Sequence, residues 1–131
     1  MTNKCVIRSL EERDLAEWLR LRTSLWDQTS EDAHKGEMVD IIEHPDSQFV
    51  AVADTGNGRL AGFLEASIRQ HVEDCDTESV GYLEGWFVDT DHRRQGIGAK
   101  LVAAAEDWAR ERGCTEMASD AEVGNTVSQQ A

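Results

Sequence analysis

Two sets of residues in this sequence have the types and spacing needed for chemistry on charged small molecules. The first is the stretch His92–Lys100, "HRRQGIGAK", in which basic residues flank Gly96 and Gly98. The second is a pair of carboxylates on predicted strands, Glu84 and Asp120. Glycine lets a backbone approach a phosphate closely, arginine donates charge-assisted hydrogen bonds, and carboxylates bind ammonium groups or accept their protons. These residues are therefore candidates for an anion site and a cation site in one chain, with a surface or salt-bridged glutamate as the alternative for Glu84.

The glycine turn lies between a predicted strand, 80–88, and a predicted helix, 99–112. Such a turn presents unpaired amide groups together with the positive end of the helix dipole, which suits a pyrophosphate. A Walker A loop, Gly-x-x-x-x-Gly-Lys-Ser/Thr, does not match this stretch. A dinucleotide-binding fingerprint requires a third glycine where Leu101 stands. The turn suits a pyrophosphate but matches neither of these two motifs, and a glycine-rich connection with solvated arginines is the alternative interpretation.

Length and charge limit the classes of function. A chain of 131 residues with 40% apolar residues predicts one folded domain. The net charge of -13 argues against nucleic acid as a partner and favours a cationic partner or substrate, although acidic proteins also arise for solubility alone. No apolar run approaches the roughly 20 residues of a membrane span, and the N-terminus lacks a signal peptide's apolar core. We expect a cytoplasmic protein that does not bind membranes.

Cysteine and histidine spacing indicates neither a disulfide framework nor a metal site. Cys5, Cys75 and Cys114 are far apart and odd in number, and no Cys-x-x-Cys occurs. The four histidines have no spacing typical of metal ligands; they are His34, His44, His71 and His92. We therefore expect no metal cofactor.

Hydrophobic periodicity predicts a mixed domain with both helices and strands. Strands are predicted at 5–8, 49–53, 60–69, 80–88 and 116–121, and helices at about 11–25, 30–43 and 99–112, with a helix starting near 125. Ser9 and Glu12 have the spacing of a capping box, and Gly85 inside a strand suggests a β-bulge. Gly113 is predicted to be the C′ residue that follows the third helix. The order of elements is typical of an α+β or α/β domain.

The glycine turn, together with its neighbours, resembles a known motif. Arg93-x-x-Gly96-x-Gly98, following a strand that ends at Val88 and opening a helix, is similar to motif A of the GNAT superfamily of N-acetyltransferases, which cradles the pyrophosphate of acetyl-CoA. The segments "GFLEASIR", "YLEGWFV", "EMASDA" and "NTVSQQA" resemble the aminoglycoside 6'-N-acetyltransferases, and the similarity spans essentially the whole chain. The resemblance implies an α+β GNAT fold, a mixed sheet flanked by helices, in a homodimer that confers antibiotic resistance.

The same resemblance assigns residues to acetyl-CoA, the expected co-substrate. The backbone of the bulged strand would pair with the pantetheine arm, and the turn amides would bind the pyrophosphate, with a structural role in the turn as the alternative for the Arg93 side chain. The residues implied are Trp86, Phe87, Val88, Arg93, Arg94, Gln95, Gly96, Ile97, Gly98, Ala99 and Asn125. The amide of Val88 is also a candidate donor to the thioester oxygen.

Four residues are implied for a cationic aminosugar substrate. Glu84 is the predicted general base for the attacking amine, and Asp120 is the second predicted catalytic carboxylate, on the opposite side of the same cleft. Trp26 is predicted to pack on a sugar ring or an ammonium group. His71 lies in a polar loop where the family contacts its substrate. Direct attack of the amine on the thioester requires no serine or cysteine nucleophile.

The resemblance also leaves alternatives open. Family members continue past Ala131 with the rest of a helix and two strands, so the single domain, 1–131, is expected to be C-terminally short. A GNAT enzyme for another polyamine or a protein lysine is one alternative. A remnant that binds CoA or drug without turnover is the other.

Overall fold

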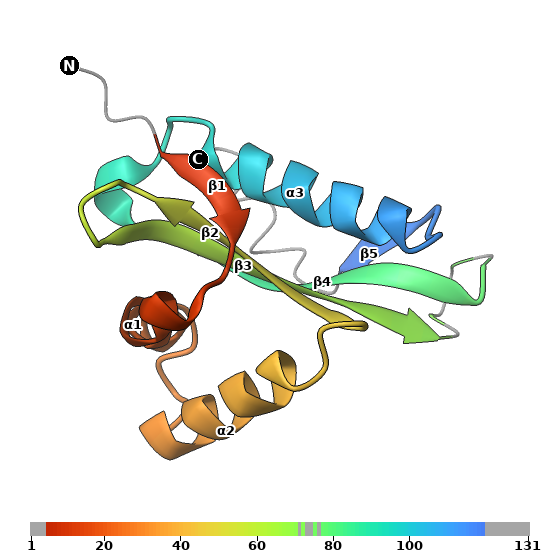
Figure 1. Cartoon of the computed structure of the whole chain (residues 1–131), viewed down its shortest axis with the longest axis horizontal. Coiled ribbons are helices and arrows are strands. Elements are labelled where there is room, and N and C mark those ends of the chain that lie inside the picture. The colour runs from red at the N-terminus through yellow and green to blue at the C-terminus, as the bar shows by residue number, and fades with distance from the viewer. Residues whose placement is uncertain (1–4, 71, 73–74, 76, 120–131) are drawn as a thin grey trace.

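A computed structural model describes residues 5–70, 72, 75 and 77–119 as a five-stranded sheet with helices on both faces (Figure 1). The strands are β1 (Val6–Ser9), β2 (Gln48–Asp54), β3 (Leu60–Gln70), β4 (Ser79–Val88) and β5 (Met117–Ser119). The helices are α1 (Leu15–Leu25), α2 (Glu31–Ile42) and α3 (Ile97–Glu111), with 3₁₀ turns at Glu12–Asp14 and Thr90–His92. The predicted α+β architecture, a mixed sheet flanked by helices, is confirmed. Within the described residues, no helix is long and apolar enough to cross a membrane.

Strand order in the sheet follows the chain, β1-β2-β3-β4-β5. The pairs from β1 to β4 are antiparallel, whereas β4 and β5 are parallel and are joined through α3. A parallel pair requires a crossover connection, which is the role of α3. This connection places the turn between β4 and α3 at the carboxyl end of β4.

The two faces of the sheet carry separate apolar cores. Figure 1 shows α3 on one face and α1 and α2 on the other. Leu64, Trp86 and Leu101 belong to the core beneath α3. Trp18 and Phe63 belong to the core beneath α1 and α2. Because neighbouring strand residues point to opposite faces, each strand can contribute to both cores.

The helix starts differ from the predicted ones in two places. Ser9 belongs to β1, so the predicted capping box of Ser9 with Glu12 is wrong. Instead the Glu11 amide donates to the Asp14 carboxylate at 2.7 Å, and a 3₁₀ turn precedes α1. The third helix begins at Ile97, two residues earlier than predicted. The predicted role of Gly113 agrees with its φ of 87°, a conformation that favours glycine.

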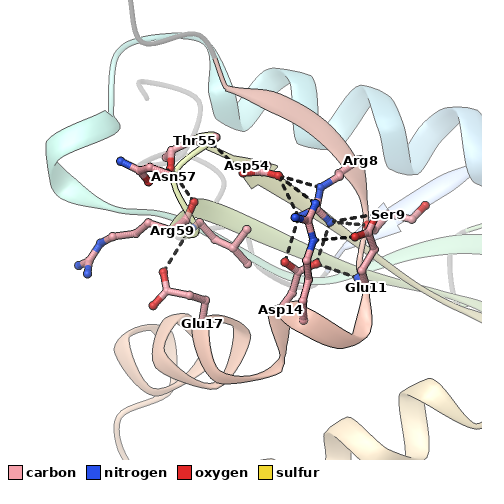
Figure 2. Close-up of polar contacts among 12 residues, drawn as sticks. Arg8, Ser9, Glu11, Asp14, Glu17, Asp54, Thr55, Asn57 and Arg59 are labelled. Carbon is pink, nitrogen blue, oxygen red and sulfur yellow. Dashed lines mark hydrogen bonds and ion pairs between the residues drawn. The ribbon is translucent and has the colours of Figure 1, made fainter.

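Arg8 ties the first strand to two other segments (Figure 2). Its Nη1 and Nη2 donate to the two carboxylate oxygens of Asp14 at 2.7 and 2.9 Å. Its Nε donates to Asp54, the last residue of β2, at 3.0 Å. We call Arg8, Asp14 and Asp54, with the nearby Glu11 and Arg13, the hairpin cluster. It fixes the start of α1 against the end of the β2–β3 hairpin.

Candidate functional site

A β-bulge in β4 sets the direction of the candidate site residues. Glu65 pairs with Gly85 and Ala66 with Leu83, so Glu84 is the extra residue without a partner in β3. The bulge predicted from Gly85 is therefore confirmed. Side chains normally alternate between faces, but here Glu84 and Gly85 both lie on the face of α1 and α2.

The glycine of the bulge allows α1 to approach closely. A Cβ atom at Gly85 would lie 2.5 Å from Cζ2 of Trp26 and 3.3 Å from a methyl carbon of Leu25. Real Cβ atoms do not approach a ring that closely, so a larger residue would push the end of α1 away. Trp26 thus rests on the strand beside Glu84.

A pocket of about 430 Å³ lies between this bulge and the two helices. Four carboxylates and one arginine line it, together with Trp26 and three other residues. Its lining residues are Arg22, Trp26, Thr29, Glu37, Asp40, Ile41, Gln48, Glu65 and Glu84. The structure therefore brings Trp26 and Glu84, which were predicted to contact substrate, to one acidic pocket.

Glu84 is held in place by two residues of the neighbouring strand β3. Its Oε1 accepts a hydrogen bond from Arg69 Nη2 at 2.7 Å, and its Oε2 accepts one from Arg69 Nε at 3.0 Å. The Ser67 hydroxyl also donates to Oε2. The Arg69 guanidinium lies 3.7 Å from the centroid of the Tyr82 ring, a cation–π contact. Both oxygens of the predicted base are thus engaged.

Sequence reasoning missed Glu65, a second carboxylate of the pocket. It is 5% exposed, and its Oε2 accepts hydrogen bonds from Trp18 Nε1 at 2.9 Å and Arg22 Nη1 at 2.8 Å. Burial raises the pKa of Glu65 to about 7, against the opposing effects of Arg22 and Trp18. The available signal was a single acidic residue within an otherwise buried strand pattern, "GFLEASIR".

Arg22 divides its charge among several partners. Its guanidinium contacts Glu65 and Glu37, and its Nε donates to His34 Nδ1 at 3.1 Å. The carbon of that guanidinium also lies 4.9 Å from the Trp26 ring centroid. Because one arginine faces two carboxylates, the pocket keeps an excess of negative charge that suits a cation.

Among the described residues, no strand pairs with the second half of β4 on the side away from β3. The described part of β5 pairs only with Gly81–Leu83. The Asp89 amide donates to the Ala61 carbonyl of β3 at 2.7 Å. Because antiparallel ladders alternate, the backbone groups of Trp86 and Val88 point away from β3, whereas those of Phe87 point toward it. Of the three residues predicted for pantetheine, Trp86 can therefore offer its backbone groups and Val88 its amide, because the Val88 carbonyl accepts a hydrogen bond from Arg93.

The glycine turn has the geometry expected of an anion site. Gly96 has a φ of 77°, which favours glycine, and directly precedes α3. The Lys100 amide donates to the Gly96 carbonyl at 3.1 Å. The amides of Ile97, Gly98 and Ala99, on the first turn, have no acceptor within the helix. These three donors and the helix dipole together favour a phosphate at this position.

The arginines of the turn have different roles. Arg93 Nε donates to the Val88 carbonyl at 2.8 Å, and its guanidinium lies 5.4 Å from the Phe87 ring centroid. Its side chain thus fastens the turn to the end of β4. Arg94, with a φ of 67°, and Gln95 are exposed beside the free amides. Arg94 is therefore the arginine of the turn placed to meet an anion from solvent.

Three predicted site residues, His71, Asp120 and Asn125, lie outside the described residues. Within the described part of the chain, no group of three or more histidine, cysteine, aspartate or glutamate side chains is arranged to hold a metal ion.

Comparison with known proteins places these features in a family context. Residues 14–131 match the model of the Acetyltransferase (GNAT) family. The aminoglycoside N(6')-acetyltransferase type 1 of Klebsiella aerogenes is 41% identical over 135 residues, covering 100% of this chain and 88% of that protein. The enzyme of the same name from Acinetobacter baumannii is 41% identical over 124 residues, covering 93% of this chain and 83% of that protein.

Solved structures give the same result. The aminoglycoside N-acetyltransferase AAC(6')-Iy in complex with CoA has a TM-score of 0.89 and 36% identity, covering 98% of this chain and 84% of that chain. A complex of AAC(6')-Iy with the bisubstrate analog CoA-S-monomethyl-acetylneamine has a TM-score of 0.86 and 37% identity, covering 95% of this chain and 84% of that chain.

Proposed function

Because this chain belongs to the GNAT family of acetyltransferases, we propose that it transfers the acetyl group of acetyl-CoA to the 6'-amino group of aminoglycoside antibiotics and so confers resistance. The observation that carries the proposal is the acidic pocket beside the β4 bulge, which four carboxylates and Trp26 line. Aminoglycosides are polycationic sugars. Carboxylates bind their ammonium groups through charge-assisted hydrogen bonds, and an indole ring packs on a sugar or faces a cation.

The proposed binding site for acetyl-CoA is the backbone at the end of β4 and in the turn that leads to α3. The pyrophosphate would accept hydrogen bonds from the amides at the start of α3, with Arg94 beside them. The pantetheine arm would run along this edge of β4 and meet the backbone groups of Trp86 and the amide of Val88. The Val88 amide would then face the thioester oxygen as it gains charge. Asn125 keeps its predicted role as a cofactor contact.

The reaction itself requires only two substrates brought together. The amine attacks the thioester carbon directly, and the C–S bond to CoA then breaks. Glu84 and Asp120 are the proposed catalytic carboxylates, which hold the amine, and Trp26 and His71 the proposed further sugar contacts. The proposal also includes a homodimer in the cytoplasm, for which light scattering and cell fractionation are the direct measurements.

A thiol-release assay with acetyl-CoA and kanamycin tests the proposal. We expect one CoA thiol per acetylated drug, with the new amide at the 6' position by NMR. Glu84→Gln should lower kcat/KM for kanamycin at least about tenfold, because a hydrogen bond to a charged group contributes about 1.5–3 kcal/mol. Its affinity for acetyl-CoA should not change.

Glu12→Gln is the matched control, because Glu12 is exposed on the 3₁₀ turn before α1 and is not among the residues lining the pocket. Faster turnover of spermidine or of a lysine peptide than of kanamycin would show that the substrate is another amine and not an aminoglycoside. Stabilisation by acetyl-CoA without thiol release for any amine would contradict the enzymatic proposal.

A further inference from the structure

Glu65 has the placement expected of a residue that takes a proton from the pocket. It extends from the middle of β3, faces Gly85 across the bulge and lines the same pocket as Glu84. Every hydrogen bond that the described residues donate to Glu65 falls on Oε2, from Trp18 and Arg22. Its Oε1 is therefore the carboxylate oxygen open to a further proton.

Glu84 is less suited to that step. Both of its oxygens accept hydrogen bonds from Arg69, and one also accepts from Ser67. A proton arriving on Glu84 would have to displace an Arg69 donor from a bidentate ion pair. That pair instead makes Glu84 a fixed negative group, because bidentate arginine–carboxylate contacts add geometric specificity.

The surroundings of Glu65 favour a neutral as well as a charged state. The charged and titratable groups that line the pocket with it or contact its partners are Arg22 from α1, His34, Glu37 and Asp40 from α2, and Glu84 from β4. Arg22 is shared with Glu37, so it compensates Glu65 only in part. Burial raises the pKa of Glu65 to about 7, and bases with a pKa near the working pH are the efficient ones.

We propose that Glu65 is a catalytic base that accepts a proton from the ammonium group of the acceptor, while Glu84, fixed by Arg69, holds that group in place. This step rests on the proposed function and moves the base from Glu84, where the sequence placed it, to Glu65. An N–H bond of the ammonium breaks and an O–H bond forms on Oε1. The freed lone pair then attacks the thioester carbon.

The remaining bonds balance without a further reactant. The new C–N bond forms as the carbonyl oxygen gains charge, and the C–S bond breaks when the tetrahedral intermediate collapses. The nitrogen gives its second proton to the departing thiolate, so that CoA leaves as the thiol. Glu65 returns its proton to solvent through the pocket, and each turnover releases one proton.

The pH dependence of kcat/KM for kanamycin tests this assignment. In the wild-type protein we expect the rate to fall as pH decreases below about 7, because a protonated Glu65 cannot accept a proton. Glu65→Gln should lower kcat about 100-fold at pH 7, and its residual rate should rise only at the higher pH at which the ammonium group of the free drug loses its proton in solution. Acetyl-CoA affinity should stay at the wild-type value.

Glu84→Gln is the comparison variant. It should raise KM for kanamycin and keep the loss of rate at acidic pH. Loss of the acidic limb centred near pH 7 in Glu84→Gln, or retention of a limb centred near pH 7 in Glu65→Gln, would overturn the role of Glu65. If Glu65→Gln does not fold, the acidic limb of Glu84→Gln decides alone. A wild-type protein that acetylates no amine would instead overturn the proposed function, and this step with it.

Discussion

The hairpin cluster and the pocket each place an arginine among carboxylates, with opposite results. Asp14 and Glu65 are equally covered, each with a side chain 6% exposed. Yet the Arg8 guanidinium and a backbone amide hold the pKa of Asp14 below its usual value, whereas burial raises the pKa of Glu65 to about 7. An arginine–carboxylate pair thus remains charged at neutral pH in one region, whereas in the other the carboxylate titrates near neutral pH.

Hydrogen bonding and depth explain the difference. Asp14 accepts from Arg8 on both oxygens and from the Glu11 amide. Glu65 accepts on one oxygen, lies between the sheet and two helices, and shares Arg22 with Glu37. Hydrogen bonds to the charged form favour it, and desolvation disfavours it. Coverage of the side chain by itself therefore does not decide which state a carboxylate prefers.

The largest effect is expected from removing the arginine of the pocket. Arg22→Met leaves Glu65 buried without its cation and should reduce the free energy of unfolding by about 3–5 kcal/mol at pH 8. The loss should be smaller at pH 5, where Glu65 can be protonated. Urea unfolding at both pH values measures it. The double change Arg22→Met with Glu65→Leu should recover most of the loss, and no recovery would mean that the pair is not coupled.

The next effect concerns the pH dependence of stability. Glu65 has a folded pKa raised from 4.5 to about 7, so the folded state keeps a proton that the unfolded state gives up. Wild-type stability should therefore fall as pH rises from about 4.5 to 7, by up to about 3 kcal/mol. Glu65→Gln should not show this fall. If the free energy of unfolding, measured with urea, depends on pH in the same way in both proteins, Glu65 is not the cause of the fall.

Asp14→Asn tests whether the pH dependence of stability has the opposite sign in the hairpin cluster. The lost charge-assisted hydrogen bonds should cost about 2 kcal/mol at pH 7. Because the pKa of Asp14 is lowered in the folded state, its stabilisation is complete above about pH 4 and is lost as pH falls further. The variant and the wild type should thus converge at acidic pH in thermal unfolding. A constant difference down to pH 2 would contradict this sign.

The smallest effect is expected at the rim of the hairpin cluster. Arg13 contacts Glu11 at 2.7 Å and Asp54 at 3.6 Å, but its side chain is 66% exposed. Arg13→Gln should change the free energy of unfolding by less than about 0.5 kcal/mol, and less still in high salt. A larger loss of the free energy of unfolding, measured with urea at low salt, would mean that the cluster acts as a single network.

Much of the fold followed from local sequence signals. The apolar stripe of α3, the strand patterns and the glycine turn each depend on residues close together in the chain, and the structure has them near the predicted bounds. Gly85 marked the bulge in the same way. The 3₁₀ turn before α1 was missed because Glu11 and Asp14 compete with Ser9 for the capping role, and short-range spacing does not choose between them.

The sequence by itself determined that this chain carries a positive glycine turn at a helix start and acidic residues on nearby strands, because both depend on residue types and short spacings. Only the tertiary structure decided which side chains lie next to each carboxylate. Glu65 meets an arginine 43 positions away, and the bulge turns Glu84 toward Arg69 and Trp26. Sheet register and helix docking set those distances, and a buried group's charge state depends on neighbours that no local pattern specifies.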